Sequence, residues 1–368
     1  MIFRSLFEPF HQHGILGINS RNLDYIYAHN PRRLYPIIDN KQETKKIAET
    51  VSVPVPETYG TIRFQNQVKQ FSQLVEQQNR FVIKPAQGSG GDGILVIDAV
   101  VEAGYRKASG KVLSLDDLEF HLHNILSGMY SLSGHTDTVL IEYAVTFDPV
   151  FDQIAYQGVP DIRVIIYQGV PAMAMLRLPT RVSDGKANLH RGGIGVGIDL
   201  ATGKTFGGIQ HNQYIECHPE TQQPLQGHQI PHWSKILQMA AKLGQATSIG
   251  YLGIDIVLDK DLGPLLLEMN ARPGISIQIA NRTGLKPRLA AIDRVAPQLT
   301  IPADRIAFAR ATFAVDDTPT APSAAALPYL STLEGQAQGD LLVATLHADV
   351  HRFVGAVAGQ QLPPRVGV

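Results

Sequence analysis

The chain has 368 residues, of which 44% are hydrophobic, so it is long enough for two or three packed units that each bury a core. Lys and Arg total 32 and Asp and Glu total 33, which excludes a strong overall field for nucleic acid or an anionic membrane. The single cysteine, Cys217, excludes an intrachain disulfide framework and a multi-cysteine metal site, which is typical of a reducing compartment.

The N-terminal segment predicts neither secretion nor membrane insertion. Glu8 and two histidines interrupt the apolar run that a signal peptide needs. The apolar stretch over residues 159–178 contains Asp161, Arg163 and Pro171, so it is not suited to span a bilayer. We therefore expect a cytoplasmic protein with no membrane span and no nucleic-acid partner.

The first part of the chain predicts a short N-terminal module, residues 1–60, followed by a compact α+β lobe, residues 61–140. A helix near Lys41 to Glu49 ends before the segment VPVPE, where prolines favour extended backbone. The lobe is expected to contain a helix over residues 67–77, the strands FVIKP and ILVID, a helix that begins after Ser114, and the strand VLIEYAV.

Residues 141–300 predict a second lobe built mainly from strands. Apolar runs separated by turns are DIRVIIYQG, VPAMAMLRLP and IGVGIDLATG, and a long helix, HWSKILQMAAKLGQAT, precedes the strand pair YLGIDIVLD and GPLLLEMNARPG. Residues 301–368 turn rich in Ala, Pro and Thr, which predicts a linker and then an amphipathic helical segment over about residues 340–357. We assign no function to this tail.

A glycine-rich loop lies inside FVIKPAQGSGGDGILVID. It formally matches the dinucleotide fingerprint G-x-G-x-x-G, but that fingerprint needs a helix after the loop, and here the β-rich run ILVID follows. A Rossmann dehydrogenase is therefore disfavoured. A strand, a glycine loop and a second strand predict a hairpin flap whose backbone amides can cover polyphosphate.

Lys84 lies in the apolar strand directly before this loop. Lysine is seldom buried without an anionic partner. A nucleotide phosphate would provide that partner, and so would an acidic side chain at the strand end; the residues alone leave both readings open.

The last predicted strand pair contains two carboxylate side chains and one amide side chain. Glu268 and Asn270 are two residues apart and share a strand face, and a hairpin through residues 260–263 would bring Asp255 opposite them. Such carboxylates repel each other unless they are protonated or bridged by cations. Mg²⁺ suits these oxygen ligands, and a structural hydrogen-bonded network is the alternative.

Arg163 and Arg177 interrupt apolar strands, and Asn188 follows in the polar loop SDGKANLHRGG. The rigid donor fork of arginine suits phosphate or carboxylate, although either arginine could instead lie on an exposed strand face. His190 could act as an acid or base, or be a hydrogen-bonded loop residue.

Taken in order, VIKP with its glycine loop, VLIEYAV, DIRV, LRLP, KANLHRGG, YLGIDIVLD and LLLEMNARPG resemble the ATP-grasp superfamily. The set is most similar to the alpha-L-glutamate ligase-like group, which includes the glutamate ligase that modifies a ribosomal protein. The resemblance covers roughly residues 19–285. It implies an α+β fold in which two lobes hold ATP between antiparallel sheets, here with an N-terminal module shorter than the usual ATP-grasp domain.

The resemblance also implies roles for individual residues. The residues expected to bind ATP are a phosphate lysine of the N-terminal module, the lysine before the flap, the flap itself and the hinge: Lys41, Lys84, Gly88, Ser89, Gly90, Gly91, Gly93, Glu142, Tyr143 and Val145. The expected Mg²⁺ ligands are Asp255, Glu268 and Asn270. Those expected near the γ-phosphate or on the acceptor side are Arg163, Arg177, Asn188 and Arg272.

The function that follows from the resemblance is ATP-dependent ligation of a carboxylate and an amine through an acyl-phosphate, with release of ADP and phosphate. ATP and Mg²⁺, or Mn²⁺ in its place, are the expected cofactors. Glutamate or a similar amino acid, and small-molecule or peptide acids and amines, are the expected substrates; an oligomer is compatible with them. Two alternatives stay open, a phosphotransferase acting on a hydroxyl or sugar and a non-catalytic nucleotide-binding regulatory module. A protein kinase is disfavoured because H-R-D and D-F-G segments are missing.

Overall fold

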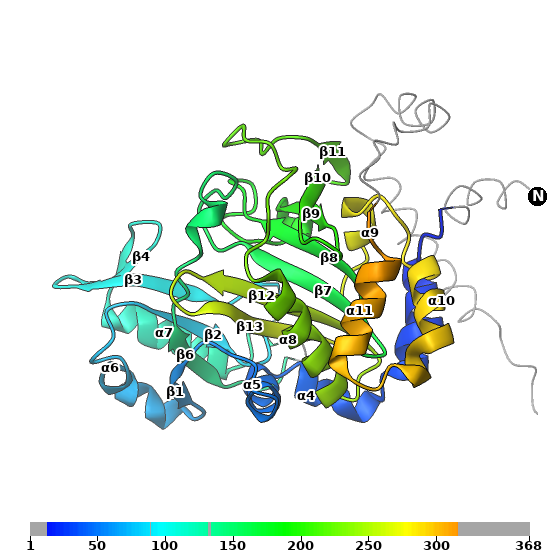
Figure 1. Ribbon diagram of the computed structural model, residues 1–368. Coiled ribbons are helices and arrows are strands. Elements are labelled where there is room, and N and C mark those ends of the chain that lie inside the picture. The colour runs from blue at the N-terminus through cyan, green and yellow to red at the C-terminus, as the bar shows by residue number, and fades with distance from the viewer. Residues whose placement is uncertain (1–12, 89, 132–133, 316–368) are drawn as a thin grey trace, which may run out of the picture. The chain divides into compact units, whose positions relative to one another are not determined.

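The computed structural model describes residues 13–88, 90–131 and 134–315. Two antiparallel sheets dominate this part of the chain (Figure 1). The first has six strands in the order β1-β6-β2-β3-β4-β5, and the second has seven in the order β11-β10-β9-β8-β7-β12-β13. With their helices they form the α+β architecture that the sequence predicts.

The six-stranded sheet contains the strand that precedes the glycine loop. Its strands are β1 (Thr58–Ile62), β2 (Phe81–Pro85), β3 (Leu95–Val101), β4 (Gly104–Lys107), β5 (Val112–Leu113) and β6 (Val139–Tyr143). Phe81 and Ile83 of β2 enter a core with helix α7 (Leu115–Leu126), which Ser114 caps. Because side chains alternate along a strand, Lys84 lies on the opposite face, together with Glu142 of the neighbouring strand.

The seven-stranded sheet carries the second group of predicted site residues. Its strands are β7 (Asp161–Tyr167), β8 (Val170–Leu178), β9 (Ile194–Ile198), β10 (Thr205–Gln210), β11 (Gln213–Ile215), β12 (Tyr251–Asp259) and β13 (Gly263–Asn270). Helices α8 (Trp233–Ala246) and α11 (Pro302–Thr312) cover one of its faces (Figure 1). Ile254 and Ile256 lie in the hydrophobic core, so alternation places Asp255 between them on the other face.

Short helical segments make up the N-terminal part and the remaining connections. They are α2 (Ile18–Ser20), the π-helical η1 (Arg21–Ile26), α3 (Tyr27–His29), η2 (Arg32–Leu34), α4 (Tyr35–Ile38), α5 (Lys41–Thr50), η4 (Pro149–Phe151), η5 (Leu189–Arg191), α9 (Ile277–Ala280), α10 (Lys286–Val295) and η6 (Ala296–Gln298). Leu16, Ile26 and Ile38 belong to the same core as the seven-stranded sheet. The N-terminal segment therefore shares that core, and the division at residues 60, 140 and 300 stays a prediction.

Two expected elements differ in the structure. The helix expected over residues 67–77 is a 3₁₀ turn, η3 (Gln65–Gln70), followed by α6 (Phe71–Leu74), because the polar run after Val75 gives a longer helix nothing to bury. Residues 302–312, expected to be linker, form α11, because Ile306, Ala309 and Phe313 recur at helical spacing and enter the core. The linker after residue 315 and the helical segment over residues 340–357 lie outside the described residues.

No helix among the described residues combines the length and hydrophobicity that crossing a membrane requires.

Asn30 joins the N-terminal segment to the large sheet. Its Nδ2 donates to the carbonyls of Tyr251, at 2.8 Å, and Ala271, at 3.0 Å, while its Oδ1 accepts from the Tyr251 amide at 2.8 Å. The side chain is almost fully buried. We expect Asn30→Ala to lower the free energy of unfolding by about 2–4 kcal/mol, because it leaves buried backbone groups without hydrogen-bond partners. Urea unfolding measures this.

The matched control is Asn66→Ala at an exposed position, which should change the free energy of unfolding by less than about 0.5 kcal/mol. Equal effects of the two substitutions would contradict the role given to Asn30.

Candidate active site

The acidic cluster predicted in the last strand pair forms as expected. The hairpin of β12 and β13 pairs Asp255 with Glu268 and Gly253 with Asn270, with a bulge after Asp255. The Nδ2 atom of Asn270 lies 3.3 Å from Asp255 Oδ2 and 3.2 Å from Glu268 Oε1. All three side chains therefore meet on the sheet face that α8 and α11 leave uncovered.

The two strand arginines bind this cluster directly. Arg163 donates from Nε and Nη2 to the two oxygens of Asp255, at 2.7 and 2.6 Å, and Arg177 adds a bond from Nη2 at 2.7 Å. Arg177 also donates from Nε to Asp161. The strand register sets these contacts, since Asp255 lies opposite Arg163 and Asp161 lies opposite Arg177. The cations that neutralise Asp255 in this structure are thus guanidinium groups.

Burial and charge act in opposite directions on the two aspartates. Burial opposes ionisation of Asp255, but the charges and hydrogen bonds of Arg163 and Arg177 hold its pKa below the ordinary value. Burial, with the nearby charge of Asp255, raises the pKa of Asp161 to about 7 in spite of Arg177. Asp255 is therefore the stable anion of the pair.

Oxygen donors suited to Mg²⁺ are present, although Asp255 is already engaged. Glu268 is partly exposed, and a half-turn of the Asn270 amide would present Oδ1 in place of Nδ2. Hard oxygen ligands of this kind are those that Mg²⁺ takes, together with phosphate oxygens. No group of three or more His, Cys, Asp or Glu side chains in the described part of the chain is arranged to hold a metal ion. The donors fit a metal that is shared with a phosphate ligand.

A basic cluster lies on the six-stranded sheet, on the face opposite the core that contains Phe81 and Ile83. Lys84 Nζ lies 2.5 Å from Glu142 Oε2, and Lys45 Nζ lies 2.5 Å from Glu142 Oε1. All three side chains are buried. Burial opposes the charge of Glu142, yet the two lysines hold its pKa below the ordinary value. Lys84 thus has an acidic partner within the protein, which was one of its two expected partners.

The glycine loop is held at its base by buried polar groups. Lys41 Nζ donates to the Gly88 carbonyl at 2.6 Å and lies 3.6 Å from Glu268 Oε2, so it connects the loop to the acidic cluster. The carboxylate of Asp137 accepts from the Gln87 amide at 3.0 and 3.1 Å. Further along the loop, Gly90, Gly91 and Gly93 have positive φ, which suits glycine. Ser89 lies outside the described residues.

The predicted hinge runs beside the end of β12. The Tyr143 hydroxyl donates to Asp259 Oδ2 at 2.9 Å, and the Thr146 amide donates to the same oxygen at 2.9 Å. Val145 lies between these two residues. The segment that leaves β6 is thereby attached to the seven-stranded sheet, and its role as a hinge stays a prediction.

The remaining predicted residues lie around this centre. The side chain of Asn188 accepts from the His190 amide at 3.0 Å, and its Nδ2 lies 3.8 Å from the position that a Cβ on Gly90 would take. Arg272 donates to Asp39 at 3.2 Å and stacks over the Tyr35 ring at 5.3 Å. Asn188 therefore borders the glycine loop, and Arg272 borders the N-terminal segment.

A family model described as sugar-transfer associated ATP-grasp matches residues 20–294. The chain belongs to this ATP-grasp family. The match confirms the superfamily and the fold that the sequence predicts, whereas membership of the alpha-L-glutamate ligase-like group stays a prediction. Comparison with curated protein sequences found no match.

Several solved structures are similar at low identity, among them an ATP-grasp ligase. The ligase PsnB complexed with minimal precursor has 15% identity and a TM-score of 0.39, over 73% of this chain and 64% of PsnB. D-cycloserine synthetase DcsG has 13% identity and a TM-score of 0.40, over 73% of this chain and 72% of its own. D-alanyl-alanine synthetase A from Vibrio cholerae has 12% identity and a TM-score of 0.41, over 71% of this chain and 65% of the synthetase. This chain thus spans less than two thirds of PsnB, and the values are too low to transfer substrates.

Sequence reasoning missed several residues of this candidate site. Lys45 lies one helical turn after Lys41, so the i, i+4 spacing places both on one face of α5. Asp161 is two residues before Arg163 and so shares its strand face. Asp137 lies in a loop, and no periodicity in the sequence pointed to it.

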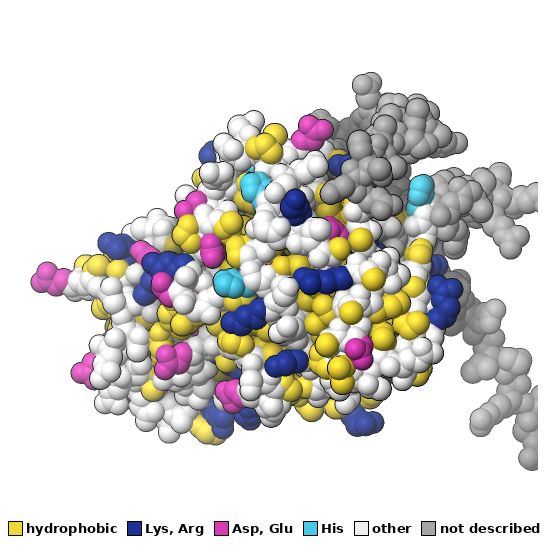
Figure 2. Space-filling model, in the orientation of Figure 1, with side chains coloured by type: hydrophobic (Ala, Val, Ile, Leu, Met, Phe, Trp, Pro, Cys, Tyr) yellow, Lys and Arg dark blue, Asp and Glu magenta, His cyan; other side chains and the backbone are white. Residues whose placement is uncertain are grey.

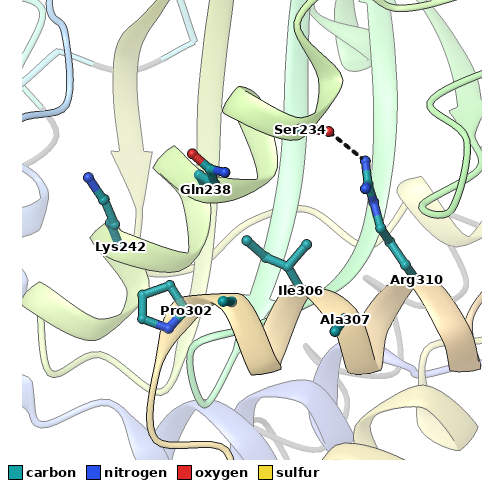
Figure 3. A pocket seen from close by; sticks show the side chains of 8 residues that line it. Ser234, Gln238, Lys242, Pro302, Ile306, Ala307 and Arg310 are labelled. Atoms are coloured by element: carbon teal, nitrogen blue, oxygen red, sulfur yellow. Dashed lines mark hydrogen bonds between the residues drawn. The ribbon is translucent and has the colours of Figure 1, made fainter.

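A separate groove lies between α8 and α11, on the face of the sheet opposite the candidate site (Figure 3). It has a volume of about 570 Å³ and is lined by Ser234, Gln238, Lys242, Pro302, Ala303, Ile306, Ala307 and Arg310. Figure 2 shows apolar side chains gathered over this face, with Lys and Arg side chains around them. Alternation along β12 points Ile254 and Ile256 to this side and Asp255 away from it, so the groove takes no part in the site.

The two aspartates should differ in their effect on stability. Asp255→Asn leaves two buried guanidinium groups without their main counter-charge, so we expect a loss of about 3–5 kcal/mol. Asp161→Asn resembles the protonated form that burial favours and should cost about 1 kcal/mol or less at pH 6. Urea unfolding of both variants measures the difference.

The raised pKa of Asp161 also predicts how the free energy of unfolding changes with pH. Because the pKa of Asp161 is raised in the folded state, its stabilising contribution is complete below the unfolded value and is lost as pH rises through about 7. Between pH 6 and 8 the unmodified protein should lose about 1 kcal/mol relative to Asp161→Asn. Equal destabilisation by both variants at both pH values would show that the assignment is wrong.

Proposed function

We propose that this ATP-grasp chain is an ATP-dependent carboxylate–amine ligase that forms an amide or peptide bond through an acyl-phosphate. The observation that carries the proposal is the position of Lys41, which contacts the base of the glycine loop and lies beside Glu268. A phosphate-covering loop and a set of oxygen donors for a cation therefore meet at one lysine. Phosphoryl transfer depends mostly on such positioning and charge neutralisation.

In the proposed reaction, an oxygen of the substrate carboxylate attacks the γ-phosphorus, the bond to the bridging oxygen breaks, and ADP leaves. The nitrogen of the amine then attacks the acyl carbon and loses a proton, and phosphate departs with one of the original carboxylate oxygens. Lys84 and Lys41 are proposed to neutralise phosphate charge, and the glycine loop to exclude water that would hydrolyse the acyl-phosphate. Glu268 and Asn270 would hold Mg²⁺, which would supply charge neutralisation at the phosphates when bound.

Substrate binding is proposed at the end of β13, where the N-terminal segment contacts it. Arg272 points its guanidinium to Asp39, and the Tyr35 ring lies beneath it. Arginine is suited to bind a carboxylate through paired donors. An acidic or amino-acid substrate such as glutamate fits this chemistry, and so does the end of a peptide. Cytoplasmic location and oligomeric assembly remain expectations from the sequence.

The main alternative is a phosphotransferase that leaves the phosphoryl group on a hydroxyl or sugar, because the same nucleotide site serves either outcome. A non-catalytic nucleotide-binding module is less well supported, since nucleotide binding alone does not require the acidic cluster. The products separate these functions.

The reaction class is tested by product analysis. With ATP, Mg²⁺ and a panel of acids and amines, we expect ADP as the nucleotide product and an amide product whose mass identifies both substrates. With the carboxylate labelled in heavy oxygen, label should appear in inorganic phosphate once amine is present. A phosphorylated product with no inorganic phosphate would indicate the phosphotransferase, and AMP would overturn the acyl-phosphate route.

The role of the acidic cluster is tested by Glu268→Gln, which keeps the shape of the side chain and removes one anionic oxygen donor. Turnover should fall by about 100-fold or more at limiting Mg²⁺, because the variant holds the metal less well. The steady-state rate of ADP release as a function of Mg²⁺ concentration measures this. Glu216→Gln, at an exposed position, is the control. Activity like that of the unmodified chain would make the cluster structural.

A further inference from the structure

Lys45 occupies a buried position that none of the functional predictions includes. Its Nζ contacts Glu142 at 2.5 Å and donates to the Pro56 carbonyl at 2.7 Å and the Thr58 hydroxyl at 2.8 Å. These three protein acceptors match the three donors of an ammonium group, so Lys45 does not need a ligand to be satisfied. A direct contact with nucleotide is therefore not its role in this arrangement.

Lys84 differs from Lys45 in this respect. The Nζ of Lys84 has one close partner among the described residues, Glu142 Oε2 at 2.5 Å, and an ammonium group has three donors. Two of those donors remain for a ligand. Glu142 is therefore shared between a lysine that is saturated by protein groups and a lysine that is not.

The charge of this cluster decides what Lys84 can bind. Lys45, Lys84 and Glu142 together carry a net charge of +1, all within a buried region. Without Lys45 the Lys84–Glu142 pair would be neutral, and its attraction for an anion would be largely cancelled. Buried excess charge is costly unless an opposite charge compensates it. The pKa of Lys45 is accordingly lowered, by burial first and also by the charge of Lys84.

We propose that Lys45 is a positioning and charge-balancing residue that neutralises Glu142 and so leaves the charge of Lys84 available to the phosphates of a nucleotide. The proposal rests on the proposed function, since it takes a nucleoside polyphosphate as the ligand. Lys45 holds one oxygen of Glu142, and Glu142 in turn orients Lys84 through the other. The nucleotide supplies the compensating negative charge when it binds.

A double-mutant cycle separates this role from a purely structural one. Lys45→Met should weaken the binding of ADP with Mg²⁺ about tenfold, because Glu142 then neutralises Lys84 fully. Adding Glu142→Gln to Lys45→Met removes the cancelling charge and should restore affinity to within about threefold of the unmodified chain. Both carboxylate oxygens of Glu142 face lysines, so its replacement removes no donor or acceptor that is free for the base.

Calorimetry with ADP and Mg²⁺ provides the readout, and Lys46→Met is the matched control. Lys46 is the next residue on α5, is exposed, and among the described residues pairs with Glu43 alone, so its replacement should leave affinity unchanged. Unfolding midpoints of all variants report whether each is folded. If Lys45→Met does not fold, Lys45→Gln keeps polar contact with Thr58 and takes its place in the cycle.

The outcomes are distinct. Weakened binding by Lys45→Met that Glu142→Gln rescues supports the proposal. Unchanged binding by Lys45→Met, or a double variant no better than the single one, overturns it while the proposed function stands. No binding of ADP by the unmodified chain would overturn the proposed function and this proposal with it.

Discussion

A single buried carboxylate, that of Asp255, constrains the arrangement of the large sheet. An ionised aspartate in this position would cost several kcal/mol without partners, because burial removes its hydration. Its partners come from two other strands, Arg163 on β7 and Arg177 on β8. A slip of one residue in either strand would turn its arginine to the opposite face and leave charges unpaired in the core. The charge network therefore fixes the strand register, and the register in turn brings Glu268 and Asn270 beside Asp255.

The two sheets carry charge clusters of different composition. On the seven-stranded sheet, Asp161 and Asp255 bind two arginines and Glu268 lies beside Asn270, so this cluster carries one negative charge only where the pH exceeds about 7 and Asp161 is ionised. On the six-stranded sheet, two lysines share Glu142, which leaves one positive charge. Such a pair of clusters is complementary to a polyphosphate that carries a divalent cation. Lys41 lies between them and contacts both the glycine loop and Glu268.

Much of this arrangement could be predicted because it depends on local patterns. The alternation of apolar residues predicts the strands, and two-residue spacing places Glu268 and Asn270 on one face. The hairpin through residues 260–263 follows from turn chemistry. Lysine in the strand before the glycine loop indicated a buried charge that needed a partner.

The partners themselves could not be predicted from the sequence. That Asp255 binds Arg163 and Arg177 depends on which strands are neighbours, and the order β8-β7-β12-β13 joins segments that are distant in the chain. Lys45 is separated from Glu142 by almost a hundred residues, and only the fold brings them together. The helix α11 was missed for a different reason. Its Ala and Pro content resembles that of a linker, and the helix is too short to show a clear apolar repeat.

The glycine loop is held by buried hydrogen bonds at its base and by exposed ion pairs farther along. Its base is held by Lys41 and by the buried carboxylate of Asp137. Loss of either group would leave the Gly88 carbonyl or the Gln87 amide without this hydrogen-bond partner. Farther along, Asp92 contacts Arg191 at 2.7 Å and Lys186 at 4.0 Å, but these side chains are substantially exposed. Exposed ion pairs contribute between zero and about 1 kcal/mol and weaken with salt. The contact between the loop and residues 186–191 can therefore break and form again without disturbing the base, as the flap proposed for nucleotide binding requires.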